Sequence, residues 1–251
     1  MIEQLVLGTI QGVAEWLPVS SEGLIYLAQA HFFSPLSLTQ AVKQALFLHF
    51  GTWLAALIYF RQKIISLPKN RNLSSFLAFG TLVSGFLGLL ILKLIENLES
   101  QFLPTGKVFT LIIGLFLIVT GYLQLKSKKE GKKTEKDLTI KTALVLGIAQ
   151  GLAVFPGLSR SGLTVATFLF LGYSKVDSLR LSFLLSLPLV LIANIFLNFN
   201  YLSQGVYLGG LLFSFVFGYL TIDLLLKIAQ KINFGKFVIF FGLLTILASL
   251  F

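Results

Sequence analysis

Two stretches of this chain decide the fold, because they are copies of each other. Residues 5–24 read LVLGTIQGVAEWLPVSSEGL, and residues 144–163 read LVLGIAQGLAVFPGLSRSGL. Aligned without a gap, the two copies are identical at half of their positions, and the identities include glutamine, serine and glycine as well as leucine. Shared leucines are common by chance in apolar segments, but shared polar residues are not. The sequence therefore contains an internal repeat.

Each copy of the repeat is interrupted near its middle. An apolar stretch ends at Pro18 and Ser20 in the first copy, and at Pro156-Gly157 and Ser159 in the second. Proline and serine are poor residues for a helix interior, and neither half is long enough to cross the ~30 Å hydrocarbon layer. We expect a re-entrant helix–break–helix hairpin in each copy, with its irregular backbone buried in protein or lining a wet cavity.

The composition is that of an integral membrane protein. The chain has 251 residues, of which 56% are hydrophobic and 12% are charged, whereas soluble domains carry roughly 25% charged residues. Its apolar runs are continuous, which excludes the alternating strands of a β-barrel. The absence of cysteine excludes disulfides and thiolate catalysis. The expected spans beyond the repeat copies are 40–60, 73–95, 107–125, 181–200, 206–226 and 237–251.

We predict an all-α polytopic membrane protein with a single membrane domain over residues 1–251. Repeat one covers about 1–125, a basic cytoplasmic loop covers 126–141, and repeat two covers about 142–251. Each repeat is predicted to hold one re-entrant hairpin and three transmembrane helices. Because an odd number of spans separates the copies, the second is expected to be inverted relative to the first. Inverted repeats commonly meet at a substrate site near the midplane.

The positions of the positive charges predict the topology. The net charge is +10, and most Lys and Arg residues fall within 61–71, 126–141, 175–180 and 227–236. The positive-inside rule assigns these four segments to the cytoplasmic side. With six full spans, both termini then lie outside. The basic character needs no nucleic-acid partner, and none is expected.

Charged and hydroxyl side chains lie at the two breaks. A charge at the bilayer centre costs at least ~2.5–3.5 kcal/mol, so Glu15 and Arg160 are expected to face a partner or a cavity. Gln11 shares a helix face with Glu15, since it lies four residues earlier. If the breaks meet, the following residues converge: Glu15, Ser20, Ser21, Ser159, Arg160, Ser161 and Thr164.

This set of residues suits a phosphate group. Arginine offers a planar fork of donors to phosphate oxygens, and helix starts present free backbone N–H groups to anions. Glu15 can hold a divalent cation or activate water. The alternative is structural: Arg160 and Glu15 form a buried pair that fixes the packing of the repeats. His49, in the middle of an apolar span, is interpreted as a hydrogen-bonded structural group.

At these residues the sequence resembles the undecaprenyl-diphosphate phosphatase, or bacitracin-resistance, family. The first family motif is present as Gln11-Gly-Val-Ala-Glu15-Trp-Leu-Pro18-Val-Ser20-Ser21. The second is present as Pro156-Gly157-Leu-Ser159-Arg160-Ser161-Gly-Leu-Thr164. Order, separation and hydropathy match the family along essentially the whole chain.

The resemblance implies metal-assisted hydrolysis of undecaprenyl diphosphate to the monophosphate and inorganic phosphate, in a multi-pass protein of the cell (plasma) membrane. It implies catalytic roles for Glu15, Ser21 and Arg160, with Glu15 also binding a divalent cation, Mg or Ca. The implied partners are the polyprenyl diphosphate and membrane lipid, with a homodimer left open. The implied substrate-binding residues are Gln11, Ser20, Gly157, Ser159, Ser161 and Thr164.

One position departs from the family pattern. Many members carry a histidine three residues after the second serine of the Pro-x-Ser-Ser turn, where this chain has Leu24, and Glu22 replaces a small residue. Either Glu15 with bound metal suffices, or His49 or Glu22 substitutes, or the protein does not hydrolyse. The alternative function is therefore a transporter of polyprenyl phosphate or another anionic lipid.

Overall fold

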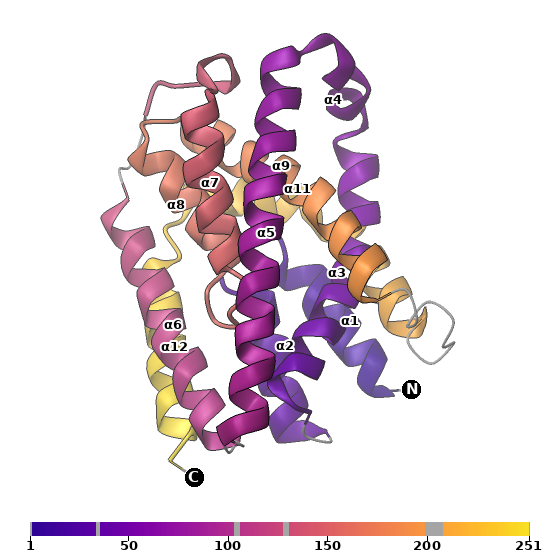
Figure 1. Ribbon diagram of the computed structural model, residues 1–251, viewed down its shortest axis with the longest axis vertical. Coiled ribbons are helices and arrows are strands. Elements are labelled where there is room, and N and C mark those ends of the chain that lie inside the picture. Colours follow the sequence, from indigo (N-terminus) through magenta and orange to yellow (C-terminus); the bar gives the residue numbers. More distant parts are fainter. Residues whose placement is uncertain (1, 34–35, 103–105, 128–130, 199–207, 251) are drawn as a thin grey trace.

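The computed structural model describes residues 2–33, 36–102, 106–127, 131–198 and 208–250 (Figure 1). Within these ranges every regular element is a helix and no strand is present, so the all-α prediction is confirmed. Short helical turns sit in the connections: α4 (Arg61–Ser66), η1 (Leu67–Lys69) and η2 (Glu135–Asp137).

Five of the described helices are long and apolar enough to cross a membrane: α3 (Leu38–Tyr59), α5 (Arg71–Phe102), α6 (Gly106–Lys126), α9 (Lys175–Leu197) and α11 (Leu208–Lys231). The chain is thus a multi-pass membrane protein.

The sixth span, predicted over 237–251, forms the shorter helix α12 (Gly235–Ala248). It has 14 residues, which at 1.5 Å per residue extend about 21 Å, less than the ~30 Å hydrocarbon layer. Five described helices, rather than the expected six, therefore reach full spanning length.

Each repeat copy forms two short helices around a break. The first copy gives α1 (Ile2–Ala14) and α2 (Ser21–Phe32), and the second gives α7 (Ile140–Leu152) and α8 (Arg160–Phe170). In Figure 1, α1 and α2 lie in the lower part of the molecule, and α7 and α8 lie in the upper part. The predicted helix–break–helix pattern is confirmed in both copies.

A serine starts the second helix of each hairpin. The hydroxyl of Ser20 accepts from the N–H of Gly23 at 3.3 Å, and the hydroxyl of Ser159 accepts from the N–H of Gly162 at 3.1 Å. Both are N-cap bonds, which satisfy a donor that the helix start leaves free. These two serine–glycine pairs are identities of the repeat, so the repeat preserves the positions at which the two helices begin.

The helices pack across the boundary between the repeats. Helix α1 packs against α11, and α7 packs against α5 in the same way. Helix α6 packs against α12, and α3 packs against α9. In addition, α3 contacts α11, and its counterpart α9 contacts α5. Exchanging the two repeats leaves this set of helix pairs unchanged. That is what a two-fold relation between the repeats requires, while the inverted orientation in the membrane stays a prediction.

Glycine allows two of these pairs to approach closely. A Cβ on Gly8 would lie 2.2 Å from the carbonyl oxygen of Gly210, and a Cβ on Gly147 would lie 2.9 Å from the carbonyl oxygen of Gly80. Gly8 and Gly147 occupy equivalent positions of the repeat. Small residues at helix contacts bring backbones together in membranes, so this identity of the repeat is explained by packing.

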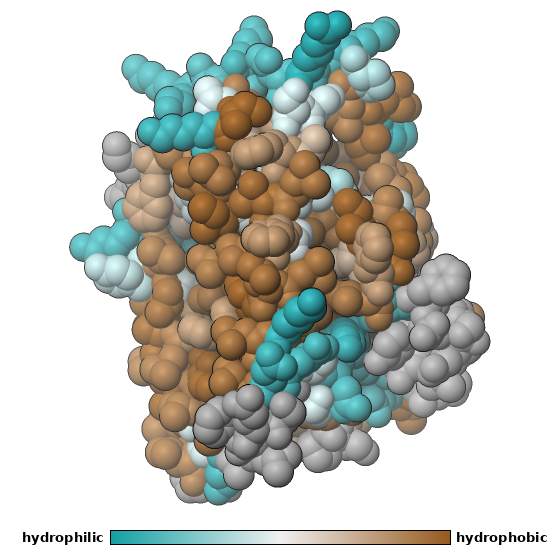
Figure 2. All heavy atoms as spheres, in the orientation of Figure 1, coloured by the Kyte–Doolittle hydropathy of each residue, from teal (hydrophilic) through white to brown (hydrophobic). Residues whose placement is uncertain are grey.

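The charged and apolar surfaces fit a membrane-embedded molecule. Hydrophobic residues cover most of the height of the face in Figure 2, and hydrophilic residues gather at the end that carries α4. Both termini lie at the opposite end (Figure 1). This arrangement agrees with a basic cytoplasmic end and with both termini on the other side.

The glycine contact predicts a specific loss of stability. Gly8→Ala should lower the thermal stability of the detergent-solubilised protein, because overpacking a tight contact costs about 1–3 kcal/mol. Gly85→Ala is the matched control, since its Cβ would meet only Leu189 at 3.7 Å and alanine favours helix. Equal melting temperatures for the two variants would contradict the close α1–α11 contact.

The inverted orientation can be tested by labelling. The chain has no cysteine, so single cysteines can be placed at Ile2, which is 72% exposed, and at the exposed Lys136. An impermeant maleimide should label these positions from opposite faces of sealed vesicles. Labelling of both from one face would exclude the predicted topology.

Candidate active site

The two breaks meet at the carboxylate of Glu15, which directly follows α1 and is 6% exposed. Its Oε1 accepts from Nη2 of Arg160, the first residue of α8. Its Oε2 accepts from Nε2 of Gln11 at 2.9 Å and from the hydroxyl of Ser21 at 3.2 Å, and lies 3.1 Å from Nε2 of His49. The predicted convergence of the breaks is confirmed, and one carboxylate joins four side chains from both repeats.

Only one edge of the Arg160 guanidinium is engaged by Glu15. Its Nη1 is buried and has no hydrogen-bond partner among the described atoms. The guanidinium carbon lies 5.5 Å from the ring centre of Phe183, a cation–π distance that stabilises a cation away from water. Arg160 is therefore a fixed cation with one donor edge left for another acceptor.

Backbone bonds hold the breaks against each other and against α6. The hydroxyl of Ser20 also accepts from the N–H of Gly157 at 3.2 Å. Thr120 of α6 donates to the carbonyl of Gly157 and accepts from the N–H of Ser159. Gln124 of α6 donates to the carbonyl of Pro18 at 2.7 Å. The role of α6 was not predicted, although Thr120 and Gln124 are polar residues within an apolar span.

A small polar cavity lies between the break residues. Its volume is about 10 Å³, roughly the room for one water molecule. The N-termini of α2 and α8 both begin at this cavity. The residues that line it are Glu15, Leu17, Ser20, Ser21, Glu22, His49, Leu158, Ser159, Arg160 and Ser161.

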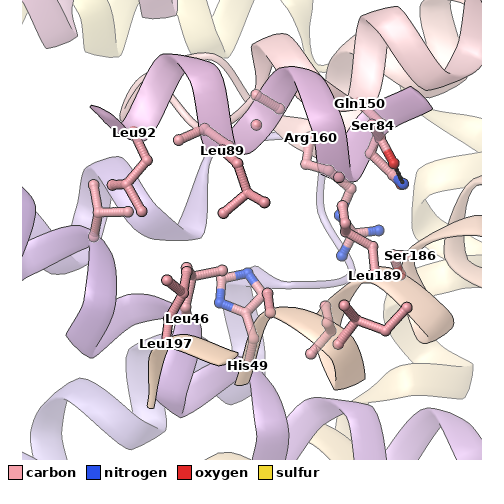
Figure 3. A pocket seen from close by; sticks show the side chains of 18 of the residues that line it. Leu46, His49, Ser84, Leu89, Leu92, Gln150, Arg160, Ser186, Leu189 and Leu197 are labelled. Carbon is pink, nitrogen blue, oxygen red and sulfur yellow. Dashed lines mark hydrogen bonds between the residues drawn. The ribbon is translucent and has the colours of Figure 1, made fainter. Parts of the chain in front are cut away.

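An apolar groove of about 110 Å³ lies beside this cavity, between α3, α5 and α9 (Figure 3). Leucines such as Leu46, Leu89 and Leu189 line it. Three polar residues, Glu22, His49 and Arg160, line both the groove and the cavity. The charged centre is therefore open to an apolar groove between membrane helices.

Most of the predicted site residues lie at this centre. Ser20, Ser21, Ser159 and Ser161 line the cavity, and Gln11 contacts Glu15 from the preceding helix turn.

Two predicted residues lie just outside the cavity lining. The hydroxyl of Thr164 donates to the carbonyl of Arg160 at 2.7 Å and lies 2.6 Å from the hydroxyl of Ser182. Gly157 has φ of +96°, the left-handed region that favours glycine, and its polar backbone atoms are engaged by Ser20 and Thr120. Their contact with substrate stays a prediction.

The structure places His49 and Glu22, the two residues considered as substitutes for the family histidine, in the cavity lining. The ring of His49 contacts Glu15 and is 4.0 Å from a carboxylate oxygen of Glu22. Leu24, one turn after Ser21, packs against an apolar cluster that includes Ala14 and Tyr26. The histidine at this centre therefore comes from α3. Its sequence signals were its place within an apolar span and the leucine at position 24, where many family members have a histidine.

The side chains as arranged do not fit a divalent cation on Glu15. Among the described residues no three His, Asp or Glu side chains surround a common point. Both carboxylate oxygens of Glu15 already contact donors, one of which is the cation of Arg160. The divalent cation stays an expectation of the resemblance, and no reaction step below is derived through it.

Residues 4–247 match the family model described as bacitracin resistance protein BacA. The chain belongs to this family. Among curated relatives, a protein of Methanococcoides burtonii named undecaprenyl-diphosphatase is 39% identical over 98% of this chain and 97% of its own. Proteins with the same name from Sulfurisphaera tokodaii and Methanothrix thermoacetophila are 36% and 34% identical, over 93% and 98% of this chain and 91% and 95% of their own. The resemblance found in the two motifs is thereby confirmed.

The buried pair predicts a strong coupling between Glu15 and Arg160. Arg160→Met alone should destabilise the protein by about 3–5 kcal/mol, because it leaves a buried carboxylate without its cation. The double variant Arg160→Met, Glu15→Gln should recover much of this loss in chemical denaturation. As a control, Asp223→Asn breaks the exposed Lys227–Asp223 pair and should change stability little. Additive effects of the two site substitutions would show that the pair is uncoupled.

Proposed function

We propose that the protein hydrolyses undecaprenyl diphosphate to undecaprenyl phosphate and inorganic phosphate in the plasma membrane, and thereby recycles the lipid carrier of cell-wall synthesis. Family membership and the names of the curated relatives support this proposal. The observation that carries it is the place of Arg160, Glu15 and Ser21 at the end of an apolar groove.

The polar cavity has the donors that a diphosphate needs. Helix N-termini carry free N–H groups and the positive end of the helix dipole, and two of them, at Ser21 and Arg160, begin here. Arg160 adds its unpartnered Nη1. Such a combination binds phosphate oxygens. The terminal phosphate is proposed to bind between these two helix starts.

The apolar groove suits the polyprenyl tail. It runs between α3, α5 and α9 and meets the cavity at Arg160 and His49. Burying hydrocarbon against its leucines keeps the head group at the charged centre. A substrate with one anionic end and one apolar end matches this pair of neighbouring spaces.

Substrate binding is proposed to exchange the partners of Arg160. The cavity of about 10 Å³ is too small for a phosphate group while Arg160 is bound to Glu15. A phosphate that takes the place of the carboxylate satisfies both edges of the guanidinium, as bidentate pairing favours. Glu15 is then free to act as a base.

The proposed reaction follows from this exchange. Glu15 accepts a proton from water, whose oxygen forms a bond to the terminal phosphorus. The bond from that phosphorus to the bridging oxygen breaks, releasing inorganic phosphate and undecaprenyl phosphate. The hydroxyl of Ser21, 3.2 Å from Glu15, donates to a phosphate oxygen once the carboxylate has moved.

The proposal predicts phosphate release by the purified protein. Wild type should release phosphate from undecaprenyl diphosphate in detergent, and Glu15→Gln should lower kcat by about 10²–10⁴-fold, since general base catalysis is typically worth that factor. Glu96→Gln is the control, because Glu96 does not line the cavity and instead pairs with Lys43, with 3.2 Å between Nζ and Oε1. Assays with and without EDTA test the expected dependence on a divalent cation.

The opposite result would favour transport. If wild type binds the lipid but releases no phosphate, the hydrolase proposal fails. Movement of polyprenyl phosphate between leaflets of proteoliposomes would then be measured.

A further inference from the structure

His49 is buried between two hydrogen-bond acceptors. Its side chain is 5% exposed. Its Nδ1 lies 2.7 Å from the carbonyl oxygen of Ala45, one turn earlier in α3, and its Nε2 lies 3.1 Å from Oε2 of Glu15. A backbone carbonyl only accepts, so Nδ1 carries a proton and donates it.

This arrangement fixes one exchangeable proton between His49 and Glu15. With Nδ1 protonated, the contact between Nε2 and Oε2 needs a single proton, whichever of the two atoms holds it. The charged groups that face the ring are Glu15 from the first break, Glu22 from α2 at 4.0 Å, and Arg160 from α8. Glu15 can act as the base of the proposed reaction only while this proton is on the ring.

The position of the His49 ring indicates which phosphate of the substrate it would contact. His49 lines both the polar cavity and the apolar groove. In Figure 3 it extends from α3 toward the space that Arg160 enters from the other side. With the terminal phosphate at Arg160 and the tail in the groove, the lipid-linked phosphate lies at the junction, beside Nε2. This is the phosphate that becomes the leaving group.

We propose that His49 is a catalytic residue that donates the proton from Nε2 to the leaving undecaprenyl phosphate, an inference that rests on the proposed function. As water bonds to the terminal phosphorus, the bridging P–O bond breaks and its electron pair stays on the lipid phosphate oxygen, which takes the His49 proton. Glu15 accepts the proton of the attacking water. This proton then passes from Oε2 of Glu15 to Nε2 of His49, which restores the starting pair. The protons therefore balance without another reactant.

A purely structural histidine would need fewer contacts. The bond from Nδ1 to the carbonyl oxygen of Ala45 would be enough to hold a structural histidine on its helix. His31 makes the same kind of bond, since its Nδ1 lies 3.0 Å from the carbonyl oxygen of Leu27. His31 is on the exposed end of α2. The feature that distinguishes His49 is therefore its second nitrogen, placed on Glu15.

The matched pair of variants is His49→Gln and His31→Gln. We expect His49→Gln to lower kcat for undecaprenyl diphosphate by about 10²–10⁴-fold with little change in KM. It should also remove the alkaline limb of the pH profile of kcat, because that limb reports loss of the proton that the acid donates. His31→Gln should keep the wild-type rate and profile.

Three outcomes would overturn the inference. One is a His49→Gln variant with wild-type kcat and pH profile. Another is a variant that is slower but keeps the alkaline limb, which would make His49 a positioning residue only. The third is an unchanged kcat in His49→Asn, the variant to use if His49→Gln melts below the assay temperature. An inactive wild type instead refutes the proposed function itself, so the two failures are distinguishable.

Discussion

The ion pair between Arg160 and Glu15 is the interaction on which the rest of the structure depends. It joins the first break to the second, and each partner comes from a different repeat. Removing both charges from water is costly, and the cost is offset only if the remaining donors and acceptors are also satisfied. Gln11 and Ser21 do this for the carboxylate. The guanidinium has Phe183 against it, but its Nη1 has no hydrogen-bond partner among the described atoms. The breaks therefore cannot move independently of each other.

Helix α6 makes this arrangement stable in a membrane. A break exposes backbone N–H and C=O groups that lipid cannot satisfy. Thr120 and Gln124 bond three of these groups, at Pro18, Gly157 and Ser159. Ser161 adds a bond from the second break to the carbonyl of Leu17 in the first. The polar centre is thus closed by protein on this side and faces the apolar groove beside α3, α5 and α9 on another.

The sequence predicted the features that depend on local pattern. The apolar lengths predicted the long helices, the repeat identities predicted equivalent breaks, and intramembrane charge predicted that Glu15 and Arg160 would meet. His49, Glu22 and Thr120 were missed or undervalued because their roles depend on helix rotation and on contacts between distant segments. Residues 237–251 were predicted as a full span, but α12 (Gly235–Ala248) has 14 residues, because a continuous apolar run favours a membrane helix without showing that the helix is long enough to cross the bilayer.

The repeat is symmetric in its scaffold but not in its chemistry. Ser20 and Ser159 cap equivalent helices, yet the position equivalent to Glu15 is Val154, and the position equivalent to Arg160 is Ser21. Each half supplies one charge and lacks the other. A dimer of two identical halves would carry both charges twice or neither, and would bury surplus charge at its axis. Duplication within one chain allows the acidic and the basic half to diverge, so fusion of the halves is a precondition of a site with a single ion pair.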